Sequence, residues 1–312
     1  MRGQKALIAM ATATALGLGP GCATETGEVR TLGLAVANLQ ANFFNQIKQS
    51  AEAYAAEQGI RVITVDARGD GATQVSQVQD LLTQGIDALI YIPAGAAAAT
   101  VPTRLARAQG VPVVNVDRNA EGEPGDTFIA SDSVASAYEV CKYLVEHVGG
   151  TGQMIIVHGQ QGTTPEADRT EGCSKALAEY PGVEVVAEQW TQIWSQDEGF
   201  QMTQNMLQAH PDVDVIFGQA DALALGAAQA VRVAGLPQRI WIGGFDGDTA
   251  ALTALRDGVF DVTATQQTQR MGRLAVDRAM ALARGEDVPA EQLLEAVLTT
   301  PDNVSQFIDS HP

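Results

Sequence analysis

Short apolar runs rich in β-branched residues alternate with longer amphipathic segments from residue 31 onward. In the first half of the chain, the apolar runs predict strands at 32–36, 61–65, 88–92 and 113–116, and the amphipathic segments predict helices at 44–59, 75–85 and 96–110. Because these strands are apolar throughout, both faces of their sheet are expected to be covered by helices. That is the arrangement of a parallel sheet.

The same alternation begins again after residue 132. Strands are predicted at 154–157, 183–186, 213–217 and 240–243, with helices at 134–148, 168–180, 199–209, 222–234 and about 271–284. The last strand of each half is followed by an aspartate, at Asp117 and Asp246. The chain is therefore predicted to be an α/β protein with two similar, doubly wound parallel-sheet lobes.

The first 23 residues have the pattern of a signal peptide. Arg2 and Lys5 precede an uncharged, mostly apolar run at 6–18, and small residues follow it. Cleavage before Cys22 would make this cysteine the lipid-bearing first residue of a lipoprotein, whereas cleavage after Ala23 would release a soluble protein. Both routes stay open, and in either case the mature chain is expected to act in the periplasm or otherwise outside the cytoplasm.

The composition indicates a folded chain, with 46% hydrophobic and 18% charged residues. Its 19 basic and 37 acidic side chains give a net charge of −18, which disfavours nucleic-acid binding. The four histidines have no metal-binding spacing, so neither a metal nor a cofactor is expected. Export into an oxidising compartment would permit Cys141 and Cys173 to pair; the alternative is two buried free thiols.

Polar and aromatic side chains follow strand ends in both halves of the chain. In open parallel sheets, ligands bind beyond the carboxyl ends of the strands. Aspartate and arginine together can grip neighbouring hydroxyls, and aromatic rings can cover the apolar face of a sugar. The residues at these ends are Asn42, Phe43, Phe44, Asp117, Arg118 and Asp246. Their shared placement predicts a cleft for a sugar or polyol.

Five further segments extend this pattern: Val116-Asp117-Arg118, Ile129-Ala130-Ser131-Asp132, Arg169-Thr170-Glu171-Gly172, Asp221-Ala222-Leu223-Ala224-Leu225-Gly226 and Gly244-Phe245-Asp246-Gly247. With them the chain resembles the periplasmic sugar-binding proteins of the ribose/galactose type, which are the substrate-binding components of ABC importers. The resemblance implies the type I periplasmic binding fold, with a multi-strand hinge. Its N-terminal lobe would comprise 29–131 and about 267–294, and its C-terminal lobe 132–266 and about 295–312.

The resemblance also implies a set of ligand contacts. Phe43 and Phe44 correspond to an aromatic pair of the first lobe, and Asp117 and Arg118 to its polar grip. The remaining counterparts are Arg169, Trp194, Asp246 and Gln266. Each residue taken alone also has an ordinary explanation as a turn residue, a surface ion pair, a solvated helix residue or a core aromatic.

Three positions depart from the pattern of the sugar-binding relatives. Ala41, Ile92 and Ala220 stand where those proteins often have asparagine. A buried ligand hydroxyl left without a partner costs roughly 1–3 kcal/mol, although Asn42, Gln219 or Asp221 could compensate from shifted positions. The expected ligand therefore has fewer hydroxyls on that side: a deoxy sugar, a short polyol, a cyclitol or an autoinducer-2-like furanosyl compound.

The predicted function is capture of a small sugar or polyol by hinge closure, followed by delivery to an ABC permease, with the protein acting as a monomer. The first alternative is a ligand-sensing binding protein for a sensor kinase or chemoreceptor. The second is a sugar-acting enzyme, which would need paired catalytic carboxylates or a metal cluster. The effector domain of a transcription repressor is disfavoured, because the fold begins directly after the export signal.

Overall fold

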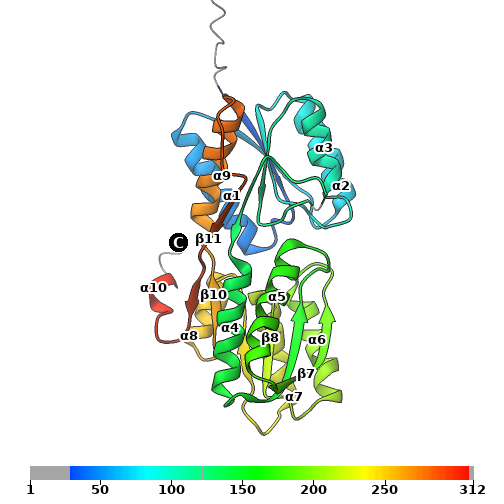
Figure 1. Ribbon diagram of the computed structural model, residues 1–312, viewed down its shortest axis with the longest axis vertical. Coiled ribbons are helices and arrows are strands. Elements are labelled where there is room, and N and C mark those ends of the chain that lie inside the picture. The colour runs from blue at the N-terminus through cyan, green and yellow to red at the C-terminus, as the bar shows by residue number, and fades with distance from the viewer. Residues whose placement is uncertain (1–28, 121, 309–312) are drawn as a thin grey trace, which may run out of the picture.

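A computed structural model describes residues 29–120 and 122–308, which form two lobes placed end to end (Figure 1). Each lobe is built on a parallel sheet with helices on both faces, so the predicted fold class is confirmed. The signal peptide predicted at 1–23, with Cys22, lies outside the described residues. Within the described ranges, no helix is both long enough and apolar enough to cross a membrane.

The N-terminal lobe contains a six-stranded parallel sheet in the order β11-β5-β4-β3-β1-β2. Helices α1 and α9 lie side by side on one face, and α2 and α3 lie on the other (Figure 1). The elements are β1 (Thr31–Val36), α1 (Asn42–Glu57), β2 (Arg61–Asp66), α2 (Gly71–Thr83), β3 (Ala88–Tyr91), α3 (Thr100–Ala108), β4 (Val113–Val116), β5 (Thr127–Ser131), α9 (Thr268–Ala283) and β11 (Glu291–Leu294).

The C-terminal lobe contains a four-stranded parallel sheet in the order β7-β6-β8-β9, extended by the antiparallel pair β10-β12. Parallel bridges from Gly243 to Val262 and from Asp246 to Thr265 connect the two parts. The elements are α4 (Ser133–His147), β6 (Thr151–His158), α5 (Thr164–Glu179), β7 (Gly182–Trp190), α6 (Gln196–Ala209), β8 (Val215–Gly218), α7 (Asp221–Ala234), β9 (Trp241–Gly243), α8 (Thr249–Arg256), β10 (Thr263–Thr265), β12 (Val297–Thr299) and α10 (Ser305–Ile308).

The chain passes between the lobes after β5, after β10 and after β11. As a result α9 and β11, although late in the sequence, pack in the N-terminal lobe, where α9 contacts α1. These short connections lie beside each other at one edge of the molecule (Figure 1). Because several strands cross there, the lobes can rotate about that edge while each sheet stays intact.

Most predicted elements are present, and one of the boundary differences has a local cause. The helix expected at 96–110 begins at Thr100, because Pro102 lacks an amide hydrogen and is tolerated only in the first turn of a helix. In the C-terminal lobe, helix α7 ends before Gly235, whose φ of 59° is left-handed, as is usual for the residue after a helix. The short strands β5 and β10–β12 were not predicted, since three to five residues carry little periodicity.

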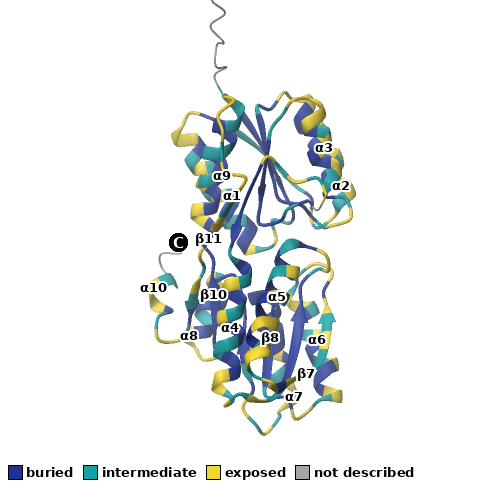
Figure 2. Cartoon of the chain, in the orientation of Figure 1, coloured by how far each residue is buried: buried dark blue, intermediate teal, exposed yellow. Residues whose placement is uncertain are grey.

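The inner strands of both sheets are buried, whereas the edge strands β2, β7 and β11 are partly exposed. The helices expose their outer faces (Figure 2). Two apolar clusters fill the two faces of the N-terminal sheet, and two more fill those of the C-terminal sheet. In the C-terminal lobe, a disulfide bond between Cys141 and Cys173 joins α4 to α5. The two cysteines therefore form a disulfide bond in the structure and are not free thiols.

Candidate ligand-binding site

A cavity of about 340 Å³ lies between the lobes, within the 300–1,000 Å³ typical of small-molecule sites. Both lobes contribute to its wall from the carboxyl ends of their strands and from the first turns of α1, α5, α7 and α8. The N-terminal lobe supplies Asn38, Gln40, Ala41, Asn42, Phe43, Phe44, Asp117 and Arg118. The C-terminal lobe supplies Pro165, Arg169, Ile193, Trp194, Ser195, Gln196, Ala220, Ala222, Leu225, Asp246, Asp248 and Ala250.

The N-terminal wall consists of an aromatic pair and an adjacent ion pair. The Phe43 and Phe44 rings, in the first turn of α1, meet edge to face with their centroids 5.3 Å apart. Arg118 Nε lies 3.5 Å from Asp117 Oδ2, and Arg118 Nη1 donates to the main-chain oxygen of Pro93 at 3.1 Å. Burial raises the pKa of Asp117 and lowers that of Arg118, while their mutual attraction opposes both shifts.

The C-terminal wall is organised around Arg169, which projects from α5. Its Nη1 donates to the main-chain oxygen of Gln219 at 2.5 Å, and its Nη2 lies 3.4 Å from Asp246 Oδ1. The guanidinium also lies 3.8 Å from the centroid of the buried Phe245 ring. Arg169 is thus held from two sides, by a carbonyl and by an aromatic face.

Aromatic rings and guanidinium groups alternate across the gap between the lobes. The Arg118 guanidinium lies 5.2 Å from the Phe44 centroid and 5.7 Å from that of Trp194. On the other side, the Arg169 guanidinium lies 5.6 Å from the Trp194 centroid. All three distances are within the range of cation–π attraction, so Trp194 links the arginine of one lobe to that of the other.

Strained backbone is concentrated at this site. Four described non-glycine residues have a positive φ, and three of them line the cavity: Asp117 at 61°, Trp194 at 61° and Asp246 at 125°. The fourth is Arg68. Such conformations persist only where the surroundings enforce them, and they cluster at functional sites. This clustering marks the cavity independently of its shape.

Two carboxyl groups of the C-terminal wall are hard to ionise. Burial raises the pKa of Asp246 to about 8, although the Arg169 guanidinium opposes the shift. Burial likewise raises the pKa of Asp248 to about 6, opposed by a hydrogen bond that Asn42 Nδ2 donates to Asp248 Oδ1 at 3.2 Å. These groups have lost water, so ligand hydroxyls that donate to them would restore missing hydrogen bonds.

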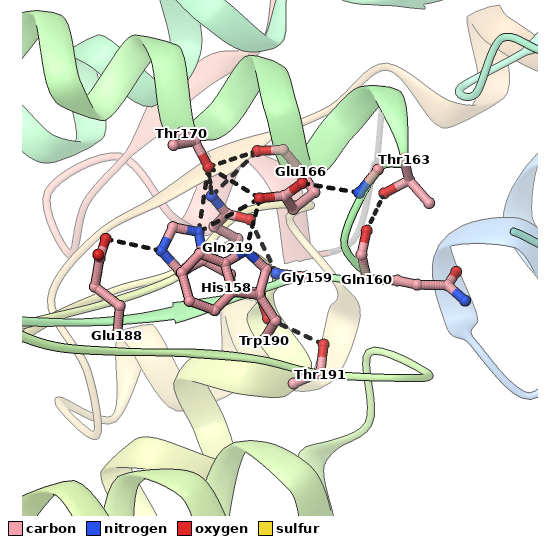
Figure 3. A network of polar contacts seen from close by, with 11 residues as sticks. His158, Gly159, Gln160, Thr163, Glu166, Thr170, Glu188, Trp190, Thr191 and Gln219 are labelled. Carbon is pink, nitrogen blue, oxygen red and sulfur yellow. Dashed lines mark hydrogen bonds and ion pairs between the residues drawn. The ribbon is translucent and has the colours of Figure 1, made fainter. Parts of the chain in front are cut away.

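A buried polar network lies behind Arg169 (Figure 3). Its centre is the fully buried Gln219, whose Oε1 accepts from the Gly159 amide at 2.9 Å. The Gln219 Nε2 donates to Thr170 Oγ1 at 2.8 Å and to the main-chain oxygen of Glu166 at 3.3 Å. The ring of His158 continues the network towards Glu188, with 3.1 Å between Nε2 and Oε1. The network ties the ends of β6 and β8 to the helix that carries Arg169.

Of the eight ligand contacts that the resemblance implies, all but Gln266 line the cavity, as do Asn42 and Ala220. Gln266, Ile92 and Asp221 lie behind its wall. Ile92 belongs to the apolar core, and its carbonyl accepts a hydrogen bond from Gln74. Gln266 Nε2 donates to Asp246 Oδ1 at 2.8 Å. Asp221 Oδ2 accepts from the amides of Gly247 and Asp248, both at 2.8 Å, so it holds the loop that follows Asp246.

Sequence reasoning missed part of the wall. Leu225 and Ala250 come from α7 and α8, and with Ala220 and Ala222 they make one side of the cavity apolar. Asp248 stands two residues after Asp246, and this spacing alone is equally typical of a turn. The helical spacing of Ala222 and Leu225 was visible in the sequence, but a three-residue interval does not reveal whether that helix face meets the core or a cavity.

Comparison with known proteins gives consistent matches over nearly the whole described chain. The family model of the periplasmic binding protein domain matches residues 32–287. The ribose import binding protein RbsB of Bacillus subtilis is 33% identical over 258 residues, covering 83% of each chain. The xylitol-binding protein of Mycolicibacterium smegmatis is 31% identical over 308 residues, covering 97% of this chain and 87% of that protein.

Solved structures show the same similarity. An ABC transporter solute-binding protein from Mycobacterium smegmatis with bound glycerol superposes with a TM-score of 0.85 at 31% identity, over 90% of this chain and 97% of that one. A second such protein, from Bacillus halodurans with bound myo-inositol, gives a TM-score of 0.84 at 27% identity, over 90% and 98% of the two chains.

Proposed function

Because the chain belongs to the periplasmic binding protein family, we propose that it captures a small sugar or polyol between its lobes and delivers it to an ABC importer. The observation that carries this proposal is the cavity, where Asp117 and Arg118 of one lobe face Arg169 and Asp246 of the other. A ligand with several hydroxyls can bond to both sets at once only when the lobes are closed. Binding therefore favours the closed form.

The aromatic groups complete the proposed grip. Phe43 and Phe44 line the cavity from one lobe and Trp194 from the other, so a ring or carbon chain can pack between them while its hydroxyls reach the charged groups. Asn42 and Asp248 form a hydrogen bond between the lobes, which stabilises the closed arrangement. The permease would then recognise the closed shape.

The ligand we propose is poor in hydroxyls on one side. Ala220, Ala222, Leu225 and Ala250 of the C-terminal wall offer no side-chain hydrogen bond, so a hydroxyl pointing at them would lose its water without replacement. Deoxy sugars satisfy this condition better than ribose, and the proposal also includes short polyols and cyclitols. The xylitol, glycerol and myo-inositol of the relatives are ligands of these last two kinds.

A thermal-shift screen of pentoses, hexoses, deoxy sugars, polyols and cyclitols tests the proposal. A ligand present at 100 times its dissociation constant should stabilise the protein by about 2.7 kcal/mol, which raises the unfolding midpoint visibly. Asp117→Ala and Arg169→Ala should each abolish the shift while leaving a cooperative unfolding transition. Lys175→Ala, on the exposed face of α5, is the control and should respond like the parent. If both cavity variants showed the full thermal shift, the proposed ligand-binding site would be wrong.

The proposed function involves no bond breaking, in keeping with a family of binding proteins. Incubation with the ligand found by the screen should therefore return it unchanged, as measured by chromatography. We also propose that the protein acts as a monomer, since both halves of the cavity come from one chain. Mass spectrometry of the exported protein would distinguish an acylated Cys22 from an N-terminus formed after Ala23.

A further inference from the structure

Trp194 lies on a short loop, residues 191–195, between β7 and α6. Its φ of 61° is left-handed, a conformation that favours glycine and is strained for a tryptophan. The indole nevertheless lines the cavity, and the guanidinium groups of Arg118 and Arg169 lie 5.7 Å and 5.6 Å from its ring centroid. Something outside the residue itself must therefore hold the loop in this shape.

The carboxylate of Glu198, in the first turn of α6, is wrapped by this loop. Its Oε1 accepts from the amide of Gln192 at 2.7 Å. Its Oε2 accepts from the amides of Ile193 and Ser195 and from the Ser195 hydroxyl, each at 3.1 Å. The amides on both sides of Trp194 thus point at one carboxylate, an arrangement known from anion-binding backbone nests.

Helix capping explains only part of this arrangement. Ser195 and Glu198 form a capping box, in which the glutamate accepts from the amide of the capping residue and the serine hydroxyl accepts from the amide of the glutamate. The bonds from Gln192 and Ile193 lie outside the helix and add nothing to its first turn. Their effect is to fix the main chain that precedes Trp194.

The indole ring packs against Gly159, the residue that follows β6. A Cβ built on Gly159 would lie 1.8 Å from Cη2 of Trp194, so the ring occupies the space that any other residue would fill. The amide of Gly159 donates to Gln219 Oε1 at 2.9 Å, and this bond holds the Gly159 main chain in place beneath the ring (Figure 3). Thr191 Oγ1 donates to the main-chain oxygen of His158 at 3.0 Å and anchors the start of the loop.

We propose that Glu198 is a positioning residue for ligand recognition, which acts by holding Trp194 over the cavity. The proposal rests on the proposed function and adds a residue that does not itself line the cavity. Asp221 offers a parallel, because its carboxylate accepts from the two amides that follow the strained Asp246. In both cases a carboxylate behind the cavity wall accepts hydrogen bonds from main-chain amides. These bonds hold the strained backbone of the neighbouring residue that lines the cavity.

The first test uses the unliganded protein. Hydrogen exchange of peptides covering 190–195 is compared in the parent, Glu198→Gln and Glu198→Ala. Exchange should be slowest in the parent, faster in the glutamine variant, which keeps one acceptor oxygen, and fastest in the alanine variant. Asp87→Ala is the matched control: this carboxylate accepts from the amides of Arg30 and Thr31 at the opposite end of the N-terminal sheet. Its loss should leave exchange at 190–195 unchanged.

The second test is a double-mutant cycle with xylitol as the probe, measured by calorimetry. Glu198→Ala should weaken binding at least tenfold in the parent and have no further effect when Trp194 is already alanine. Glu198→Gln should restore part of the affinity, and Asp87→Ala should bind like the parent. A purely structural role would instead reduce affinity equally in both backgrounds.

The outcomes separate the two proposals. Unchanged exchange at 190–195 in Glu198→Ala, unchanged affinity, or a loss that is the same with and without Trp194 would each overturn the positioning role while the protein still binds its ligand. A parent that binds none of the pentoses, hexoses, deoxy sugars, polyols and cyclitols of the thermal-shift screen at millimolar concentration would overturn the proposed function, and the positioning role with it.

Discussion

Behind Phe43 and Phe44 in the N-terminal lobe lies an apolar cluster, whereas buried polar side chains lie behind Arg169 and Asp246 in the C-terminal lobe. The two phenylalanines pack on a core that includes Ile47, Ile92 and Met271. Behind the C-terminal wall lie four polar side chains that are fully buried and hydrogen-bonded: Gln219, Asp221, Thr263 and Gln266.

This difference determines how each half of the cavity is held in place. Apolar packing is non-directional, so it tolerates changes that conserve volume. Hydrogen bonds are directional, and a single missing partner leaves a buried polar group unsatisfied. Two of the three strained cavity residues, Trp194 and Asp246, belong to the C-terminal lobe. The hydrogen-bonded half is therefore expected to be the more precisely shaped and the more easily damaged.

The largest effect is expected from the disulfide of the C-terminal lobe. Replacing Cys141 and Cys173 by alanine removes a cross-link that spans 32 residues, which should lower the unfolding free energy by about 3–4 kcal/mol. Chemical denaturation of the variant and the parent measures this difference. Reductant should destabilise the parent but not the variant, and equal stability of the two proteins would contradict the prediction.

Gln219→Leu should have the second-largest effect on the unfolding free energy. The substitution roughly conserves volume but leaves the buried Gly159 amide without a partner and removes a donor to Thr170, which keeps its bond to the Glu166 carbonyl. We therefore expect a loss of about 2–3 kcal/mol in unfolding free energy. Phe44→Leu, the matched change in the apolar wall, should cost about 1 kcal/mol. Denaturant unfolding of both variants tests the contrast between the lobes, which equal losses would refute.

Asn42→Ala should have a smaller effect, confined to binding. It removes the hydrogen bond to Asp248, which joins the lobes, so affinity for the ligand should fall by about threefold to tenfold without a change in unfolding free energy. Titration calorimetry measures the affinity. Asn45→Ala, in the same helix but outside the cavity lining, is the control and should bind normally.

The smallest effect concerns pH. Burial raises the pKa of Asp248 from its ordinary 3.8 to about 6 in the folded protein. Because the folded value is the higher one, the stabilisation from this group is complete below about pH 4 and is lost as the pH rises through 6. A shift of about two pKa units corresponds to about 3 kcal/mol. Because Asp248 is only partly buried, solvent screening should reduce the loss of unfolding free energy between these values, relative to Asp248→Asn, to on the order of 1 kcal/mol. Thermal unfolding across this range measures the difference, with the exposed Asp212→Asn as control.

The part of the cavity that could be predicted follows directly from strand ends. Asp117 and Arg118 come immediately after an apolar run, and Asp246 follows another, so parallel topology alone places them at one edge of each sheet. Arg169 and Trp194 lie on a helix and a loop with no such marker, and their assignment depended on family resemblance. The structure brings all five to the cavity wall.

The predictions that need revision concern residues one layer back. The resemblance implies Gln266 as a contact and the sequence offers Asp221 as a compensating one, yet both hold the wall from behind. Ile92, where the relatives often have asparagine, packs in the core. Glu198 carries no mark in the sequence beyond its place at the start of a predicted helix. A sequence reports that a carboxylate begins a helix, but not that the preceding loop folds its amides around it.

The sequence by itself determined the two-lobed α/β architecture, because apolar periodicity and strand length are local properties that survive in any parallel sheet. Only the tertiary structure decided which polar residues line the cavity and which lie behind its wall and support them. That distinction depends on contacts between residues distant in the chain, such as Gln219 with Gly159 and Asn42 with Asp248. No local pattern encodes them, since each pair forms only after both sheets have been assembled and brought together.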